Sequence, residues 1–257
     1  MFRHLTVVCS VRDVVQLPLE EVYVLKVRVK YEKTGPLKFI SHLDVMRYFQ
    51  KGIRRAGLDI SYTKGMSPHQ IISFAAPMPL MMTSLGEYFD AEFESVTTAK
   101  DMVERFNAVG SPYLKMVDCV ILPDSCENSM AAVTASDYLI TFNEKIKDTV
   151  SLEEILKTAE LLYDSEVIEV IKKTKKSESL TNIRPGIINM QIRDGSIYIM
   201  LDAGSKNNLK PELFIEAIAK KIDKEISRFS YAIERQETYL TNEKGEYLSL
   251  LSAGETF

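Results

Sequence analysis

Long hydrophobic runs are missing from this chain of 257 residues. No stretch approaches the roughly 18 consecutive apolar residues that a membrane-spanning helix needs. The N-terminal segment interrupts its apolar patches with Arg12, Asp13 and Glu20, which a secretory signal does not do. We therefore expect a cytoplasmic protein without a membrane partner.

Cysteine and histidine are scarce, with three of each in the chain. Cys9, Cys119 and Cys126 have spacings that match neither a disulfide framework nor a zinc or iron–sulfur ligand set, so we expect free thiols and no metal site. Phosphate-cradling Gly-x-x-x-x-Gly-Lys, nucleophile-elbow and paired-histidine zinc motifs are absent as well. By itself the sequence indicates no reaction, no bound cofactor and no oligomeric state.

Positive charge is concentrated in one segment of an otherwise acidic protein. The net charge is −4, yet residues 26–71 hold ten basic and three acidic side chains, a local balance of +7. Such a segment predicts a localised anion site, because general attraction to polyanions would require a basic whole. The alternative is a solvent-exposed charged face that binds no ligand.

Hydrophobic periodicity places a strand and then a helix in this basic segment. Apolar and basic residues alternate over 25–31, which predicts a half-buried strand with its basic side chains on the opposite face. Ser41 and Asp44 form a capping box, and Gly57 is placed to end the helix that follows. We expect the helix to bury a stripe formed by Leu43, Met46, Phe49 and Ile53.

The order of elements repeats in the second part of the chain, where Asp194-Gly195 predicts a hairpin turn and Pro211 a helix start. Each half is close to a βαββαβ pattern, so we expect an α+β fold with two tandem ferredoxin-like domains. The predicted divisions are a loose extension over 1–23, a first domain over 24–126, a linker over 127–136, a second domain over 137–241 and a C-terminal tail over 242–257. The extension fits the pattern poorly, and one hypothesis is that it arises from an upstream, non-native start codon, the alternative being a native extension.

The predicted anion site surrounds the first helix and the loop that returns beside it. Arginine forks match phosphate oxygens, and a helix N-terminus offers free amides. The candidate binding residues are Lys33, Lys38, Ser41, His42, Arg47, Lys51, Arg54, Arg55, Tyr62, Lys64 and His69. Only His42 is a candidate catalytic residue, and a histidine at a helix start more often has a structural role.

The stretch "RVKYEKTGPLKFISHLDVMRYFQKGIRRAGLDISYTKGMSPH", with "ISFAAPMPL" and "GEYFDAEFE", resembles the DUF2344 family of bacterial radical SAM-associated proteins. Most family members have Gly-Phe-Asn-Pro-His-Pro where this chain has residues 65–70, and a glycine where it has Met81. The resemblance implies a radical SAM partner that often has a cobalamin-binding region. S-adenosylmethionine and an iron–sulfur cluster would then be held by that partner, because this chain lacks Cys-x-x-x-Cys-x-x-Cys.

These observations favour a non-catalytic accessory protein that presents a polyanionic substrate, with structured RNA as the favoured class, to a radical SAM enzyme. One alternative is a metal-independent RNA endonuclease that uses His42 as a general acid or base. Another is a subunit whose basic segment docks only on the radical SAM partner.

Overall fold

The computed structural model describes residues 24–148, 150–173, 178–204 and 207–257. The predicted extension over 1–23, its proposed non-native start and Cys9 lie outside the described residues. Within the described ranges, Cys119 and Cys126 are free thiols, and no helix has the length and apolar character needed to cross a membrane. The same ranges contain no group of three or more side chains that could hold a metal ion.

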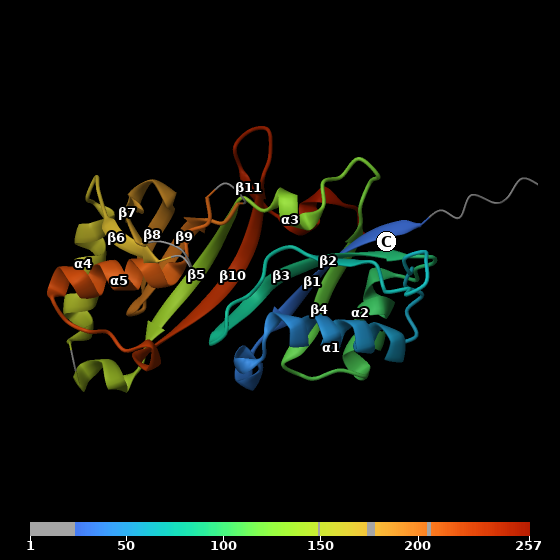
Figure 1. Ribbon diagram of the computed structural model, residues 1–257, viewed down its shortest axis with the longest axis horizontal. Coiled ribbons are helices and arrows are strands. Elements are labelled where there is room, and N and C mark those ends of the chain that lie inside the picture. The colour runs from blue at the N-terminus through green and yellow to red at the C-terminus, as the bar shows by residue number, and fades with distance from the viewer. Residues whose placement is uncertain (1–23, 149, 174–177, 205–206) are drawn as a thin grey trace, which may run out of the picture.

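One large sheet runs through the whole molecule, as Figure 1 shows. Its central path follows the order β4-β1-β3-β10-β5-β9-β8, with β2 paired to β3 and β11 paired to β10. Its strands are β1 (Leu25–Lys33), β2 (Ile72–Phe74), β3 (Met82–Phe93), β4 (Leu114–Ile121), β5 (Ala135–Phe142), β8 (Ile187–Arg193), β9 (Ser196–Asp202), β10 (Tyr231–Thr241) and β11 (Tyr247–Ser249). The strands β6 (Glu169–Lys173) and β7 (Glu178–Asn182) form a separate two-stranded sheet.

Helices pack on this sheet in both halves of the chain. The α-helices are α1 (His42–Arg55), α2 (Ala99–Ala108), α3 (Ser129–Ala132), α4 (Leu152–Tyr163) and α5 (Pro211–Ile222). Short 3-10 helices are η1 (Gly35–Phe39), η2 (Glu144–Asp148), η3 (Arg184–Gly186), η4 (Arg228–Ser230) and η5 (Leu250–Ala253). The fold is therefore α+β, with a mostly antiparallel sheet.

Local sequence signals account for several element boundaries. Ser41 caps α1 by accepting a hydrogen bond from the backbone N–H of Asp44, and Gly57 has the left-handed φ of +65° that ends the helix. Asp194 and Gly195 both have positive φ in the turn between β8 and β9, as a two-residue hairpin turn requires. Pro211 occupies the first turn of α5. These four predictions are confirmed.

The predicted apolar stripe of α1 is wrong at its first position. Leu43 is 60% exposed, whereas Val45, which the stripe omitted, is buried together with Phe49 and Ile53. The buried face of α1 is rotated relative to the predicted stripe, because Gly52 is buried as well. A Cβ at Gly52 would lie 2.5 Å from the ring of Phe106 on α2. Close contact between the two helices thus decides which side of α1 faces the core.

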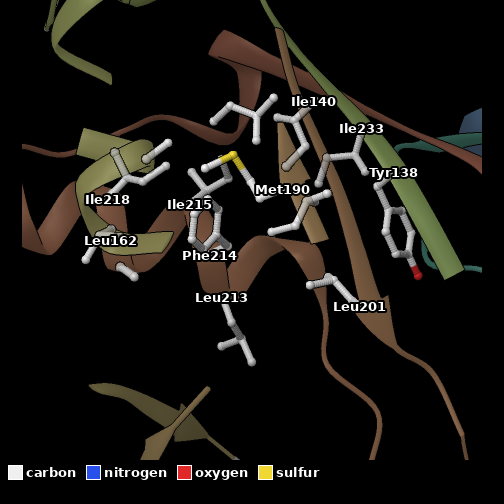
Figure 2. Close-up of a cluster of buried hydrophobic side chains, with 14 of the residues drawn as sticks. Tyr138, Ile140, Leu162, Met190, Leu201, Leu213, Phe214, Ile215, Ile218 and Ile233 are labelled. Atoms are coloured by element: carbon white, nitrogen blue, oxygen red, sulfur yellow. The ribbon is translucent and has the colours of Figure 1, made fainter. Parts of the chain in front are cut away.

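Two large apolar clusters form most of the core, and a small third one lies around Tyr88 and Leu250. One lies between α1, α2 and the strands β1, β3 and β4, with Phe49, Phe89 and Phe106 at its centre. The other lies between α4, α5 and the strands β5, β8, β9 and β10. Figure 2 shows this second cluster, with Tyr138 at its edge and the Tyr138 hydroxyl pointing away from the other labelled side chains.

The two halves meet where β10 lies parallel to β3. Residues 233–235 pair with residues 82–84, while the neighbouring pairs on the main path of the sheet are antiparallel. At the end of this contact, a Cβ on Gly86 would lie 2.6 Å from the Cα of Glu237, so only glycine allows the approach. The two predicted domains remain a prediction, since a single sheet includes strands of both.

The predicted linker and tail are ordered parts of the fold. Residues 127–136 include α3 and the first two residues of β5. The segment 242–257 includes β11 and η5, and Leu250 is completely buried. Both segments cover the face of the sheet that carries Arg28, which donates to the backbone carbonyls of Glu127 and Leu250.

Candidate functional site

The candidate site lies at the C-terminal half of α1 and the hairpin that follows it. Tyr62 and Gln70 pair as an antiparallel bridge, so the loop between them returns beside the helix. Thr63 closes this loop: its N–H donates to the carbonyl of His69 at 2.9 Å, and its Oγ1 accepts from the N–H of His69 at 3.1 Å. The imidazole Nδ1 of His69 also lies 3.1 Å from Thr63 Oγ1, which fixes the ring against the loop.

A hollow of about 190 Å³ separates this hairpin from the helix. Its walls are Gln50, Arg54, Tyr62, Pro68, His69 and Gln70. Arg54, Tyr62 and His69 were all predicted as binding residues, and the hairpin that follows α1 brings them together around the hollow. The hollow therefore combines a cation, an aromatic ring and an imidazole on one small concave surface.

The remaining cations of α1 extend from this hollow over the outer surface of the helix. Arg47, Lys51, Arg54 and Arg55 are all exposed, and their spacing places them along one stripe. We call these four residues the arginine stripe. Arg47 has a 3.6 Å contact with Asp44, but both side chains are more than half exposed, so the pair contributes little. Among the described residues, Lys51, Arg54 and Arg55 have no salt-bridge partner.

Four further predicted residues lie at the opposite end of α1: Lys33, Lys38, Ser41 and His42. His42 and Arg54 are separated by twelve helical positions, which is about 18 Å of helix. Lys33 is 1% exposed and donates from Nζ to the carbonyl of Ile40 at 3.2 Å, so its ammonium group is engaged inside the protein. Lys38 lies over the ring of Phe39, and Ser41 caps the helix. The sequence predicted one site, whereas these residues form a second group of largely structural character.

His42 belongs to this second group. Its ring is half-buried and packs edge-on against Phe74, with a centroid distance of 5.4 Å. Burial lowers the pKa of His42 below its ordinary value; Glu87 acts in the opposite direction and Lys33 in the same direction. His42 is therefore neutral at pH 7 and lies at the end of α1 away from the hollow.

Gln50 and Gln70 are site residues that sequence reasoning missed. Gln70 is 7% exposed, and neither its Nε2 nor its Oε1 has a hydrogen-bond partner among the described residues. Lys64, a predicted binding residue, is exposed on the loop beside the hollow but does not line it. No sequence signal marks Gln70, because a glutamine in a loop is ordinarily solvent-exposed.

Buried charges at the junction of the two halves were also missed. Arg235 is 6% exposed, and its Nη1 donates to Glu87 Oε1 at 2.7 Å while its Nη2 donates to the Tyr138 hydroxyl at 3.3 Å. On β1, Arg28 is fully buried and makes two hydrogen bonds to Asp90, at 2.7 and 3.0 Å. The alternating pattern predicted a basic face exposed to solvent there, but α3 and η5 cover it.

Comparison with known proteins assigns the chain to a family. Residues 26–211 match the model of DUF2344, described as an uncharacterized protein conserved in bacteria. No curated protein matches the chain. A similar solved structure is titled "Crystal Structure of a Cbf5-Nop10-Gar1 Complex", with a TM-score of 0.42 and 9% identity; the match covers 82% of this chain and 48% of that one. A likeness at this level does not identify a function.

Proposed function

We propose that this protein, which belongs to the DUF2344 family, is a binding module for a polyanionic substrate. RNA is the favoured class of substrate. The observation that carries the proposal is the hollow between α1 and the Tyr62–Gln70 hairpin. It places Arg54, Tyr62 and His69 on one concave surface next to the rest of the arginine stripe.

Cations beside an exposed aromatic ring are the combination that single-stranded nucleic acids require. Guanidinium groups along a groove follow the phosphates, and an aromatic side chain stacks on a base. Tyr62 is 44% exposed, so part of its side chain is accessible to a partner. Structured RNA offers such bases in loops and bulges, where they are unstacked and can enter a small hollow.

The topology supports a finer description of the scaffold, in which each half is one ferredoxin-like unit. The first half has the element order β1-α1-β2-β3-α2-β4, and β4, β1, β3 and β2 are consecutive partners. In the second half, β10, β5, β9 and β8 are consecutive partners, and β6 and β7 form an additional hairpin. The βαββαβ order recurs, and the parallel pair of β3 and β10 joins the two units.

The family resemblance supplies the partner in this proposal. The protein would act in the cytoplasm as an accessory subunit and present RNA to a radical SAM enzyme, which would hold S-adenosylmethionine, an iron–sulfur cluster and often cobalamin. Purification of the tagged protein from its native host, with and without nuclease, tests this part. Recovery of a radical SAM protein together with a defined RNA supports it; recovery of the protein partner alone makes the arginine stripe a protein-docking surface.

The binding proposal is tested directly by removing two charges of the arginine stripe. We expect Arg54→Ala/Arg55→Ala to weaken binding of a short single-stranded RNA. The salt dependence should fall by about 0.7 in log–log slope for each phosphate that the variant no longer neutralises. Fluorescence anisotropy at several salt concentrations measures both quantities.

The matched control is Lys220→Ala/Lys221→Ala, which removes two exposed cations from the last turn of α5 in the other half. This double variant has the same change in net charge and also lies in the last turn of its helix. If both double variants lose the same affinity for RNA, the loss is explained by the change in net charge alone, and this result would contradict a binding site at α1. Melting temperatures close to that of the wild type show that both variants are folded.

A further inference from the structure

The amide of Gln70 is the least satisfied polar group beside the hollow. Both its donor nitrogen and its acceptor oxygen are closed to solvent, and neither has a partner among the described residues. Buried amides in folded proteins are normally hydrogen-bonded, because leaving them unpaired is destabilising. Gln70 also lines the hollow, so a partner that enters the hollow and displaces the side chains covering the amide would satisfy both groups.

The position of Gln70 is fixed by its surroundings. Its backbone pairs with Tyr62, and the next residue, Ile71, donates its N–H to the carbonyl of Ser61 at 3.0 Å. The far end of the loop is closed by the hydrogen bonds between Thr63 and His69. The amide is thus carried by a short closed hairpin, which can hold it in one place for recognition.

The size of the hollow limits its occupant. At about 190 Å³ it is smaller than the roughly 300–1,000 Å³ of pockets that bind drug-sized molecules, and it suits one flat ring system. The exposed ring of Tyr62 at its wall provides a surface for stacking, and Arg54 provides a cation for the attached phosphate. A single unpaired nucleobase meets these three conditions.

We infer that the hollow binds one unpaired adenine base of an RNA strand and that the Gln70 amide recognises it. Gln70 Oε1 accepts a hydrogen bond from the adenine N6 amino group, and Nε2 donates to adenine N7, the pairing that this amide forms best with a base edge. Guanine presents two acceptors at the same edge, so the amide pairs with only one of them. Pyrimidines lack this edge.

This inference rests on the proposed function, because it names the base that the RNA-binding module selects. Entry of the base requires side chains at the mouth of the hollow to shift, and Tyr62 and Arg54 are exposed and able to do so. The family pattern has proline where this chain has Gln70, so we expect adenine preference in this chain and not throughout the family.

Base preference is measured by comparing single-stranded RNAs of equal length that contain adenosine, uridine or 7-deazaadenosine. We expect the wild-type protein to bind the adenosine strand about 5- to 150-fold more tightly than the uridine strand. The 7-deazaadenosine strand, which lacks the N7 acceptor, should lose most of this advantage. Gln70→Met keeps the length of the side chain but removes both hydrogen-bonding groups, so it should remove the preference and leave the salt dependence unchanged.

A second readout separates recognition from folding. Because Gln70→Met replaces an unpaired buried amide by an apolar group, we expect its melting temperature to rise even as its adenine preference disappears. The pair Tyr62→Leu and Tyr62→Phe provides an independent check at an exposed position: Leu should weaken adenosine binding by about 5- to 150-fold because it cannot stack on the base, whereas Phe should preserve it.

The outcomes distinguish this inference from the proposed function. RNA binding by the wild type without base preference, or an unchanged preference in Gln70→Met, overturns the adenine assignment and leaves the binding module standing. In that case the amide is an unpaired buried group without a role in recognition. Absence of RNA binding altogether overturns both.

Discussion

The charges at the β3–β10 junction and the charges of the arginine stripe are arranged in opposite ways. At the junction, Arg235 is buried and paired with Glu87, and Lys30 contacts Glu237 of β10 at 2.5 Å. On the outer side of α1, Lys51, Arg54 and Arg55 are exposed, and no described residue forms a salt bridge with them. Both regions are rich in basic residues, but only one leaves its cations free for a ligand.

The difference teaches how to separate structural charge from functional charge in this chain. A buried arginine is retained in the fold only when a carboxylate and further hydrogen bonds offset its desolvation, as Glu87 and Tyr138 do for Arg235. A cation that stays in water needs no such partner and contributes little to stability. Substitutions should therefore change stability at the junction and binding at the arginine stripe.

The largest expected effect is the loss of Glu87. In Glu87→Ala, Arg235 keeps its charge but loses its carboxylate partner in a buried position, and we expect destabilisation by about 3–5 kcal/mol. Urea denaturation followed by circular dichroism measures this change. A loss below about 1 kcal/mol would place the pair in the same class as an exposed salt bridge.

A double-mutant cycle provides the control. Glu87→Leu/Arg235→Met removes both charges and keeps apolar volume, so it should be much closer to the wild type than Glu87→Leu or Arg235→Met alone. If the double variant is as unstable as the sum of the two single variants, the charges do not interact.

A smaller loss is expected from Gly86→Ala at the same junction. The added Cβ would lie 2.6 Å from the Cα of Glu237, so β3 and β10 must separate locally, at a cost of roughly 1–3 kcal/mol. The same denaturation experiment measures it, with Leu85→Ala at the exposed neighbouring position as the control. Equal stability of the two variants would show that the strands adjust without separating.

The smallest expected effect concerns the pH dependence of stability at His42. Burial holds the folded pKa of His42 below the value of 6.5 that applies in the unfolded chain. The neutral ring therefore contributes stability that is fully present above pH 6.5 and is lost as the pH falls through the folded pKa. His42→Gln should lose less melting temperature over this acid range than the wild type. Parallel curves for the two proteins would mean that His42 does not titrate differently on folding.

Local elements could be predicted from the sequence because their causes are local. The Ser41 cap, the Asp194-Gly195 turn and the first-turn Pro211 each depend on residues within a few positions of one another. The part of the site that depends on helical spacing, the arginine stripe, was predictable for the same reason. Exposure of those four side chains follows directly from the amphipathic pattern of α1.

Long-range features had no comparable signal. The burial of Arg28 depends on Asp90, α3 and η5, which lie from about sixty to more than two hundred positions away along the chain. Nothing near Gln70 indicates that its amide is enclosed, because part of the wall beside it, Gln50 and Arg54, comes from α1. The place of β10 between β3 and β5 also has no local signal, since its neighbours lie far away along the chain.

The place of β10 has a consequence for how the protein is made. The strand that fills the gap between β3 and β5 is synthesised after both of them, so each has an unpaired edge while the chain is still emerging from the ribosome. Unpaired edges are templates for aggregation. Ribosome-bound chains that stop before residue 231 should therefore depend on chaperones, and addition of residues 231–241 should release them.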